Sequence, residues 1–223
     1  GKLKPGSQSM DGLTYWLDPD DATTITQSGV ADIDVIRDKS FAVPSAQCES
    51  IALKRPTVVS AGGRDWMSFD GATQYLQAKS GGAATMAISS VLGSAASGWE
   101  MHAIIDSDVA PGIDVTHPYK NTAVIMDSSG YWGIAAKQDP AAALTNVIIQ
   151  PNSYNGAGAT GSHFQNYIIP KNEKHVFGLS YTGGSNNLIT YKDGSATTTG
   201  CSADIPSNLG GVLQLGLGYS AQY

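Results

Sequence analysis

Apolar and polar residues alternate along most of the chain in short runs, and each run ends at turn residues. An alternation of period two is typical of a β-strand that buries one face. The segments with this pattern, in which we predict strands, are 13–18, 57–60, 66–69, 74–78, 99–106, 122–127, 131–136, 145–150, 174–181, 187–192 and 211–217. About ten strands at this spacing are typical of a sandwich or a barrel.

Turn residues separate the predicted strands. They are Ala61-Gly62-Gly63, Asp70-Gly71, Ser129-Gly130, Gly183-Gly184 and Asp193-Gly194. Tight hairpins need positive φ, which Gly, Asn and Asp adopt most readily. Residues 19–56 follow no clear period apart from apolar patches at 33–35 and 51–53, so we predict an irregular stretch there.

Only one helix is expected. Residues 83–92 are rich in alanine and are bounded by glycines, which predicts one short helix. Residues 140–144 fit a further helical turn, because Asp139 can cap it and Pro140 suits its first position. Two long segments, 107–121 and 151–163, are predicted to be loops and are where we expect a binding surface.

Composition and charge narrow the function. The chain has 16 Asp but 3 Glu, and 10 Lys but 3 Arg, which suits turns and excludes an all-helical protein. The net charge is −6 and the basic residues are scattered, which argues against nucleic acid or an anionic membrane as a partner. No apolar run reaches the ~18 residues of a membrane span, so no membrane insertion is expected.

The pattern indicates one domain over 13–223, preceded at 1–12 by a linker or a remnant of cloning. The two cysteines, Cys48 and Cys201, stand far apart without a CxxC motif. They can form a bridge, but free thiols are the expected state.

Six segments follow one another in a characteristic order. They are 13–18 (LTYWLD), 69–76 (FDGATQYL), Trp99–Asp106, 122–136, 174–194 with its ending Tyr191-Lys192-Asp193-Gly194, and 212–218 (VLQLGLG). In this order they resemble the concanavalin A-like, laminin-G-like jelly-roll domains of phage and bacterial surface proteins. The resemblance implies an all-β, two-sheet antiparallel jelly-roll sandwich on a virion or an extracellular surface. It also implies contacts with other virion or appendage subunits, and a homo-oligomer.

The resemblance implies a further strand after the VLQLGLG run, beside the opening strand. The sequence ends at Tyr223, before that strand. We therefore expect the sandwich to lack its last strand or to receive it from a neighbouring polypeptide, because a bare edge invites pairing. The alternative is that the opening strand is simply an edge.

Catalytic chemistry is not expected, although the same jelly roll hosts glycoside hydrolases. Those enzymes hold two carboxyl groups about 5–10 Å apart. The three glutamates, Glu49, Glu100 and Glu173, are isolated, and no Glu-x-Asp-x-Glu run or Gly-x-Ser-x-Gly elbow occurs. The sequence therefore predicts a protein that is not an enzyme.

No cofactor is expected, with calcium as the one candidate. Lectin-like jelly rolls often carry it at a rim, and Asp106 and Asp108 supply oxygen ligands where a strand meets a loop. The cluster Asp18-Pro19-Asp20-Asp21 is equally acidic, and we interpret it as a turn.

Aromatic and polar loop residues are the candidates for ligand binding. Sugar rings stack on aromatic faces while polar side chains bond their rims. The candidates are Trp132, Tyr154, His163, Tyr119 and Asn155. We expect Trp16, Trp66 and Trp99 in the core, and we interpret His102 and His175 as structural strand residues.

Two hypotheses result. The first is a non-catalytic, lectin-like adhesion module that binds a host-surface glycan or polysaccharide. The second is a purely structural virion or appendage domain that contacts other subunits and binds no sugar. Fold alone decides neither.

Overall fold

The computed structural model describes residues 15–40, 46–50, 54–70, 73–80, 84–85, 99–106, 123–127, 132–138, 145–153, 163–181, 187–200 and 212–216. Over these residues the chain forms antiparallel strands and one short 3₁₀ turn, Ala22–Thr24. The prediction of an all-β protein is therefore confirmed. None of the helical structure in the described ranges has the length and apolar character needed to cross a membrane.

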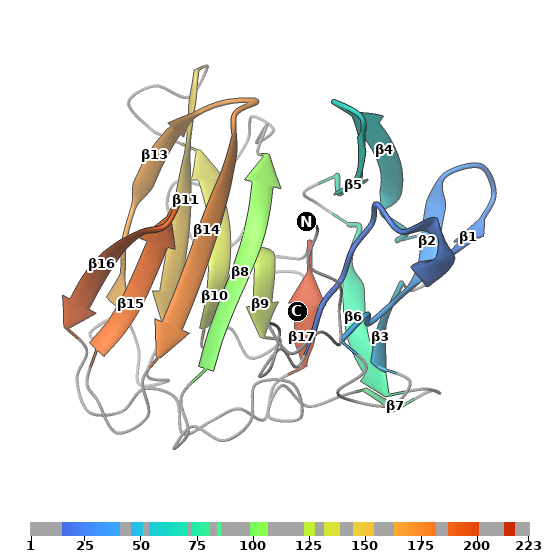
Figure 1. The fold of residues 1–223 in the computed structure, drawn as a ribbon, viewed down its shortest axis with the longest axis horizontal. Helices are drawn as coiled ribbons and strands as arrows, with labels where there is room; N and C mark the ends of the chain where they lie inside the picture. Colours follow the sequence, from blue (N-terminus) through green and yellow to red (C-terminus); the bar gives the residue numbers. More distant parts are fainter. Residues whose placement is uncertain are drawn as a thin grey trace, which may run out of the picture.

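The larger of the two sheets runs in the order β12-β11-β10-β9-β17-β6-β3-β2-β4-β5, with β1 beside β2, β13 beside β11 and β7 beside β6. Its strands are β1 (Ile25–Ser28), β2 (Asp32–Arg37), β3 (Ala46–Ser50), β4 (Thr57–Ala61), β5 (Arg64–Ser68), β6 (Leu76–Ser80), β7 (Ala84–Thr85), β9 (Ala123–Asp127), β10 (Trp132–Gln138), β11 (Asn146–Ser153), β12 (His163–Phe164), β13 (Tyr167–Pro170) and β17 (Leu213–Leu215). Figure 1 shows β10 and β11 behind the smaller sheet, β9 beside β8, and the strands from β17 to β5 further to the right.

The smaller sheet has the order β16-β15-β14-β8. Its strands are β8 (Trp99–Asp106), β14 (Lys174–Tyr181), β15 (Asn187–Lys192) and β16 (Ser195–Gly200). The turn between β15 and β16 is the predicted Asp193-Gly194, with φ values of 50° and 81°. Two consecutive positive φ values give the type of turn that matches the twist of a hairpin. The predicted hairpin of β4 and β5 has the same feature at Gly62 and Gly63.

The core lies between the two sheets in two clusters. In the first, Leu179, Tyr181 and Leu188 of the smaller sheet pack against the strands at one end of the larger sheet, and in the second Ile105 and Phe177 pack against the other end. Buried partners from the larger sheet are Ile33, Ile36, Cys48, Leu76, Ala78, Leu213 and Leu215 in the first cluster, and Ile134, Ala136, Val147, Ile149 and Ile169 in the second. One face of the smaller sheet is thus buried along its length.

The prediction of an irregular stretch over 19–56 is wrong, because it contains β1, β2 and β3. Thr26 pairs with Val35 while Gln27 pairs with Ile33, so Asp34 is an extra residue in β2. This bulge lets Ile33 and Ile36 both reach the core although they are three positions apart. The period of two, on which the prediction depended, is therefore broken.

The predicted opening strand at 13–18 is also wrong over 15–18, which form no strand. Residues directly after β2 hold the backbone of this segment. The amide of Trp16 donates to Asp38 at 2.7 Å, and the carbonyl of Trp16 accepts from the Lys39 amide at 2.8 Å. These bonds give the N–H and C=O groups of Trp16 their hydrogen-bond partners, although the segment is not part of a continuous β-ladder.

The predicted helix at 83–92 is wrong at its start. Ala84 and Thr85 form β7, paired with Ser80 and Lys79 of β6. Lys79 and Ser80 lie beyond the β6 residues that pair with β17, and pairing with β7 at this point overrides the modest helix propensity of the alanines. Residues 86–92 lie outside the described residues, as do the predicted turn at 140–144, the loop 107–121 and the end of the chain from 217.

Candidate functional site

The outer face of the smaller sheet is the surface that points away from the larger sheet. Successive side chains of a strand point to opposite sides. Ile105, Phe177, Leu179 and Leu188 are buried in the core, so the residues between them point outward. This outer face includes Glu100, His102, Ile104 and Asp106 of β8, Lys174, Val176, Gly178 and Ser180 of β14, and Ile189 and Tyr191 of β15.

Two aromatic rings meet at the centre of the outer face. His102 of β8 and Tyr191 of β15 are both paired with Gly178 of the strand between them. Their ring centroids are 5.5 Å apart, and the ring planes are tilted by 50°. A Cβ at position 178 would overlap the His102 ring and lie 3.1 Å from Cδ2 of Tyr191. The missing side chain of Gly178 therefore makes the space in which the two rings meet.

Polar groups flank this aromatic pair. Nε2 of His102 is in contact with Oε1 of Glu100, its neighbour on the same strand and face. The Tyr191 hydroxyl lies 3.1 Å from Oγ of Ser180, and either atom can donate. His102 keeps 45% of its side chain exposed. The ring pair is thus accessible, and hydrogen-bonding groups stand beside it.

The next row of the outer face, on the side of the rings away from Glu100 and Ser180, holds two apolar residues. Ile104 of β8 and Val176 of β14 are directly opposite each other in the ladder. Ile104 is 54% exposed and Val176 39% exposed. Large apolar side chains that lie together on a surface often mark an interaction site. The aromatic pair and this apolar pair occupy consecutive rows of one sheet face.

Charged residues lie at the end of the outer face, in the row after Ile104 and Val176. Nζ of Lys174 lies 3.6 Å from Oδ2 of Asp106, its cross-strand partner. The same ammonium group lies 4.7 Å from the ring centroid of Trp66 on β5. Trp66 is half-buried, and its Nε1 donates to the Ala61 carbonyl at 3.0 Å. Asp106, a predicted calcium ligand, is therefore paired with a lysine, and Asp108 lies outside the described residues.

His175 lies on the inner side of β14 at the rim of the core. Its Nδ1 is 2.7 Å from Oδ2 of Asp193, and its Nε2 is 3.3 Å from Oε2 of Glu173. Its ring meets Phe177 edge-on at 6.1 Å. The backbone N–H of Val176, together with His175, lowers the pKa of Asp193. His175 thus anchors the β15–β16 turn to β14, which agrees with a structural role.

Two of the five predicted sugar-contact residues lie on one row of the larger sheet. The backbone of Trp132 in β10 pairs with Ser153 of β11, and Ser153 also pairs with His163 of β12. The structure brings these two backbone positions to the same end of the sheet. Tyr119, Tyr154 and Asn155 lie outside the described residues.

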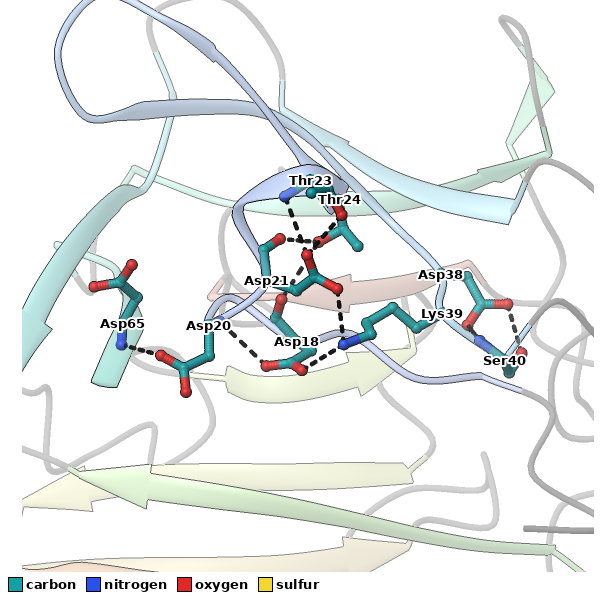
Figure 2. Close-up of polar contacts among 9 residues, drawn as sticks. All are labelled: Asp18, Asp20, Asp21, Thr23, Thr24, Asp38, Lys39, Ser40 and Asp65. Carbon is teal, nitrogen blue, oxygen red and sulfur yellow. Dashed lines mark hydrogen bonds and ion pairs between the residues drawn. The ribbon is translucent and has the colours of Figure 1, made fainter. Parts of the chain in front are cut away.

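The acidic cluster Asp18, Asp20 and Asp21 forms a turn whose carboxylates are bonded by other groups of the same chain, as Figure 2 shows. Nζ of Lys39 lies 2.8 Å from Oδ2 of Asp18 and 3.0 Å from Oδ2 of Asp21. Oδ1 of Asp20 accepts from the backbone N–H of Asp65 at 2.8 Å. The hydroxyl of Thr23, followed by Lys39, lowers the pKa of Asp21 to about 2.

These carboxylates bond to their own chain, and they do not assemble into a metal site. In the ranges that the structure describes, no three His, Cys, Asp or Glu side chains are grouped so that they can hold a metal ion. The interpretation of this cluster as a turn is consistent with the contacts of Lys39 and with the 3₁₀ turn that comes next in the chain.

Cys48 is a free and fully buried thiol. Its Sγ lies 3.2 Å from the hydroxyl of Tyr15. Burial raises the pKa of Cys48 to about 12, and burial also raises the pKa of Tyr15. A neutral thiol of this kind packs as a small apolar group and carries no nucleophilic chemistry. The prediction that this cysteine is free is confirmed.

The sequence interpretation missed the outer face. It treated His102 as structural and did not consider Tyr191 as a contact residue. The signal that pointed there is Gly178, which interrupts an otherwise regular strand, KHVFGLSY. A glycine inside a strand often marks close approach by another group. Comparison of the chain with protein-family models and with curated proteins finds no match.

Proposed function

We propose that the chain is a non-catalytic, lectin-like adhesion module that binds a glycan on the outer face of the smaller sheet. The observation that carries the proposal is the ring pair of His102 and Tyr191, held over Gly178 on an accessible surface. The C–H face of a sugar ring packs on aromatic rings, while its hydroxyl groups need hydrogen-bond partners at the side. The Glu100 carboxylate, which is 55% exposed, and the Tyr191 hydroxyl stand in those positions.

The fold and its resemblance support the same proposal. Two antiparallel sheets packed face to face are compatible with a jelly-roll sandwich, and the ordered segments resemble those of phage and bacterial surface proteins. On that basis the ligand belongs to a host-surface polysaccharide, and the module sits on a virion or an appendage. The alternative, a purely structural subunit, predicts that the outer face binds no sugar.

A glycan array with the full chain and two variants tests the proposal. Tyr191→Ala removes one ring of the outer face, and Trp132→Ala removes the indole at the rival location on the larger sheet. We expect the wild type to bind a defined set of glycans and Tyr191→Ala to weaken binding about tenfold or more. Trp132→Ala should bind as the wild type does.

Two results would overturn the proposal in different ways. Absence of binding to any glycan, on the array and in solution at millimolar concentrations, would favour the structural subunit. Loss of binding in Trp132→Ala with retention in Tyr191→Ala would place the site on the larger sheet. Thermal unfolding of each variant shows whether it is folded.

A further inference from the structure

The outer face combines an aromatic pair with an apolar pair in adjacent rows. His102 and Ile104 are two positions apart on β8, as are Gly178 and Val176 on β14, and each β8 residue is opposite its β14 counterpart. Residues two apart on a strand are separated by about 7 Å, and cross-strand partners by about 5 Å. A ring that stacks on His102 and Tyr191 therefore places its edge substituents over Ile104 and Val176.

The apolar pair decides which substituent is accepted there. The side chains of Ile104 and Val176 consist only of methyl, methylene and methine groups. A hydroxyl group placed on them loses its hydrogen bonds to water and gains none from these side chains. A methyl group in the same position removes apolar surface from water on both sides. The face thus favours a sugar whose ring carries a methyl group at its edge.

The charges of the outer face favour an uncharged ligand. Glu100 lies at one end of β8 and Asp106 at the other, and Lys174 is paired with Asp106. The Glu100 carboxylate repels an anionic sugar, and the net charge of −6 adds to this repulsion. Uronic and sialic acids are therefore disfavoured.

We infer that the outer face selects neutral 6-deoxyhexoses, with Ile104 and Val176 as the residues that distinguish the C6 methyl group from the hydroxymethyl group of an ordinary hexose. A 6-deoxyhexose carries its methyl group directly on the ring, so the group extends the stacking face without adding a polar atom. This inference rests on the proposed function, because it assigns the ligand class of the same site.

Matched glycoconjugates test this inference. The probes end in L-fucose or L-galactose, L-rhamnose or L-mannose, and 6-deoxy-D-glucose or D-glucose, so each pair differs only at C6. Both members of a pair carry the C6 carbon, so the expected difference in Kd is the cost of removing an unpartnered hydroxyl from water, which is worth about fivefold or more. We expect the wild type to bind the 6-deoxy member of at least one pair about five- to tenfold more tightly.

Two threonine variants identify the residues responsible. Ile104→Thr and Val176→Thr keep the β-branched shape that suits a strand but place a hydroxyl on the patch. Each should reduce the C6 preference to about twofold or less while retaining binding of the hexose. Ile168→Thr is the matched control, because Ile168 is 57% exposed on β13 of the other sheet. It should keep the preference of the wild type.

The outcomes separate the two claims. Binding of both members of each pair with equal affinity, or a C6 preference that survives both Ile104→Thr and Val176→Thr, overturns the inference and leaves the proposed function standing. Preference for an N-acetylated or anionic sugar over every 6-deoxyhexose also overturns it. Binding of none of the probes or of any array glycan overturns both. Self-association that Ile104→Thr abolishes, without any sugar binding, would overturn both as well and show that the patch joins two copies of the chain.

Discussion

His102 and Tyr191 come from strands that are not neighbours, and their rings meet across Gly178 with centroids 5.5 Å apart. The strand between them contributes no side chain at this row, so the rings close over its backbone. The arrangement depends on the register of three strands, because both aromatic residues pair with the same glycine.

Gly178→Ala is predicted to disturb the ring pair more than the fold. The new Cβ overlaps the ring of His102, whose side chain is 45% exposed and can rotate away. We expect the free energy of unfolding to change by at most about 1 kcal/mol, since alanine also reduces the freedom of the unfolded chain. Glycan binding should weaken about as much as in His102→Ala. Equal binding by Gly178→Ala and the wild type would contradict the role given to this pair.

Lys39→Met is predicted to destabilise the fold by about 1–2 kcal/mol. The ammonium group of Lys39 contacts Asp18 and Asp21 and lies 4.8 Å from the ring centroid of Trp16, and methionine retains only the apolar stem. Chemical denaturation measures the change. Arg64→Met, at the exposed start of β5, is the control and should change stability by less than about 0.5 kcal/mol. Equal stability of the two variants would contradict the prediction.

Asp21 is predicted to contribute stability that disappears in acid. Its pKa of about 2 in the folded protein lies below the value of about 3.9 in an unfolded chain. A carboxyl group with a lowered pKa stabilises the fold above the unfolded pKa, and this contribution is lost as the pH falls through the folded pKa.

The measurement compares the unfolding free energy of the wild type with that of Asp21→Asn between pH 6 and pH 2. Asp21 is partly exposed, so solvent screening reduces its contribution to about 1 kcal/mol at pH 6. The difference between the two proteins should shrink below pH 4 and be small at pH 2. A difference that is constant over this range would show that the carboxylate charge is unimportant.

Cys48 is predicted to be unreactive in the folded protein. With a pKa of about 12 and no exposed surface, it stays a neutral, inaccessible thiol at pH 8. In a Cys201→Ser background, a thiol reagent should detect Cys48 only after denaturant unfolds the chain. Fast reaction of the native protein would contradict the burial of Cys48 beneath Tyr15.

Strands with an unbroken alternation could be predicted from the sequence with correct limits. Trp99–Asp106, Lys174–Tyr181 and Asn187–Lys192 all occur with the bounds expected, and Asp193-Gly194 marks the turn after the last of them. The strands β1 to β3 could not be predicted in this way. The bulge at Asp34 puts Ile33 and Ile36 on the same side, and a local pattern cannot show that a ladder partner makes this possible.

The candidate site was harder to predict for a different reason. Local sequence places His102 in one strand and Tyr191 in another, but it does not say that β8 pairs with β14, which lies far along the chain. Which residues share a row depends on the register between strands that are far apart in the sequence, and the local pattern does not contain that register. Gly178 was the only local sign of the site, and a glycine alone does not identify what approaches it.

The most direct test of the proposed binding face is an NMR titration of the labelled chain with the strongest glycan from the array. We expect the largest shift changes at the Gly178 amide and the side chains of Ile104, Val176, Ile189 and Tyr191. The Ile168 methyl groups on β13 should stay unchanged. Shift changes confined to the larger sheet, at Ile168 or along the row of Trp132, Ser153 and His163, with the outer face of the smaller sheet unaffected, would contradict the proposal.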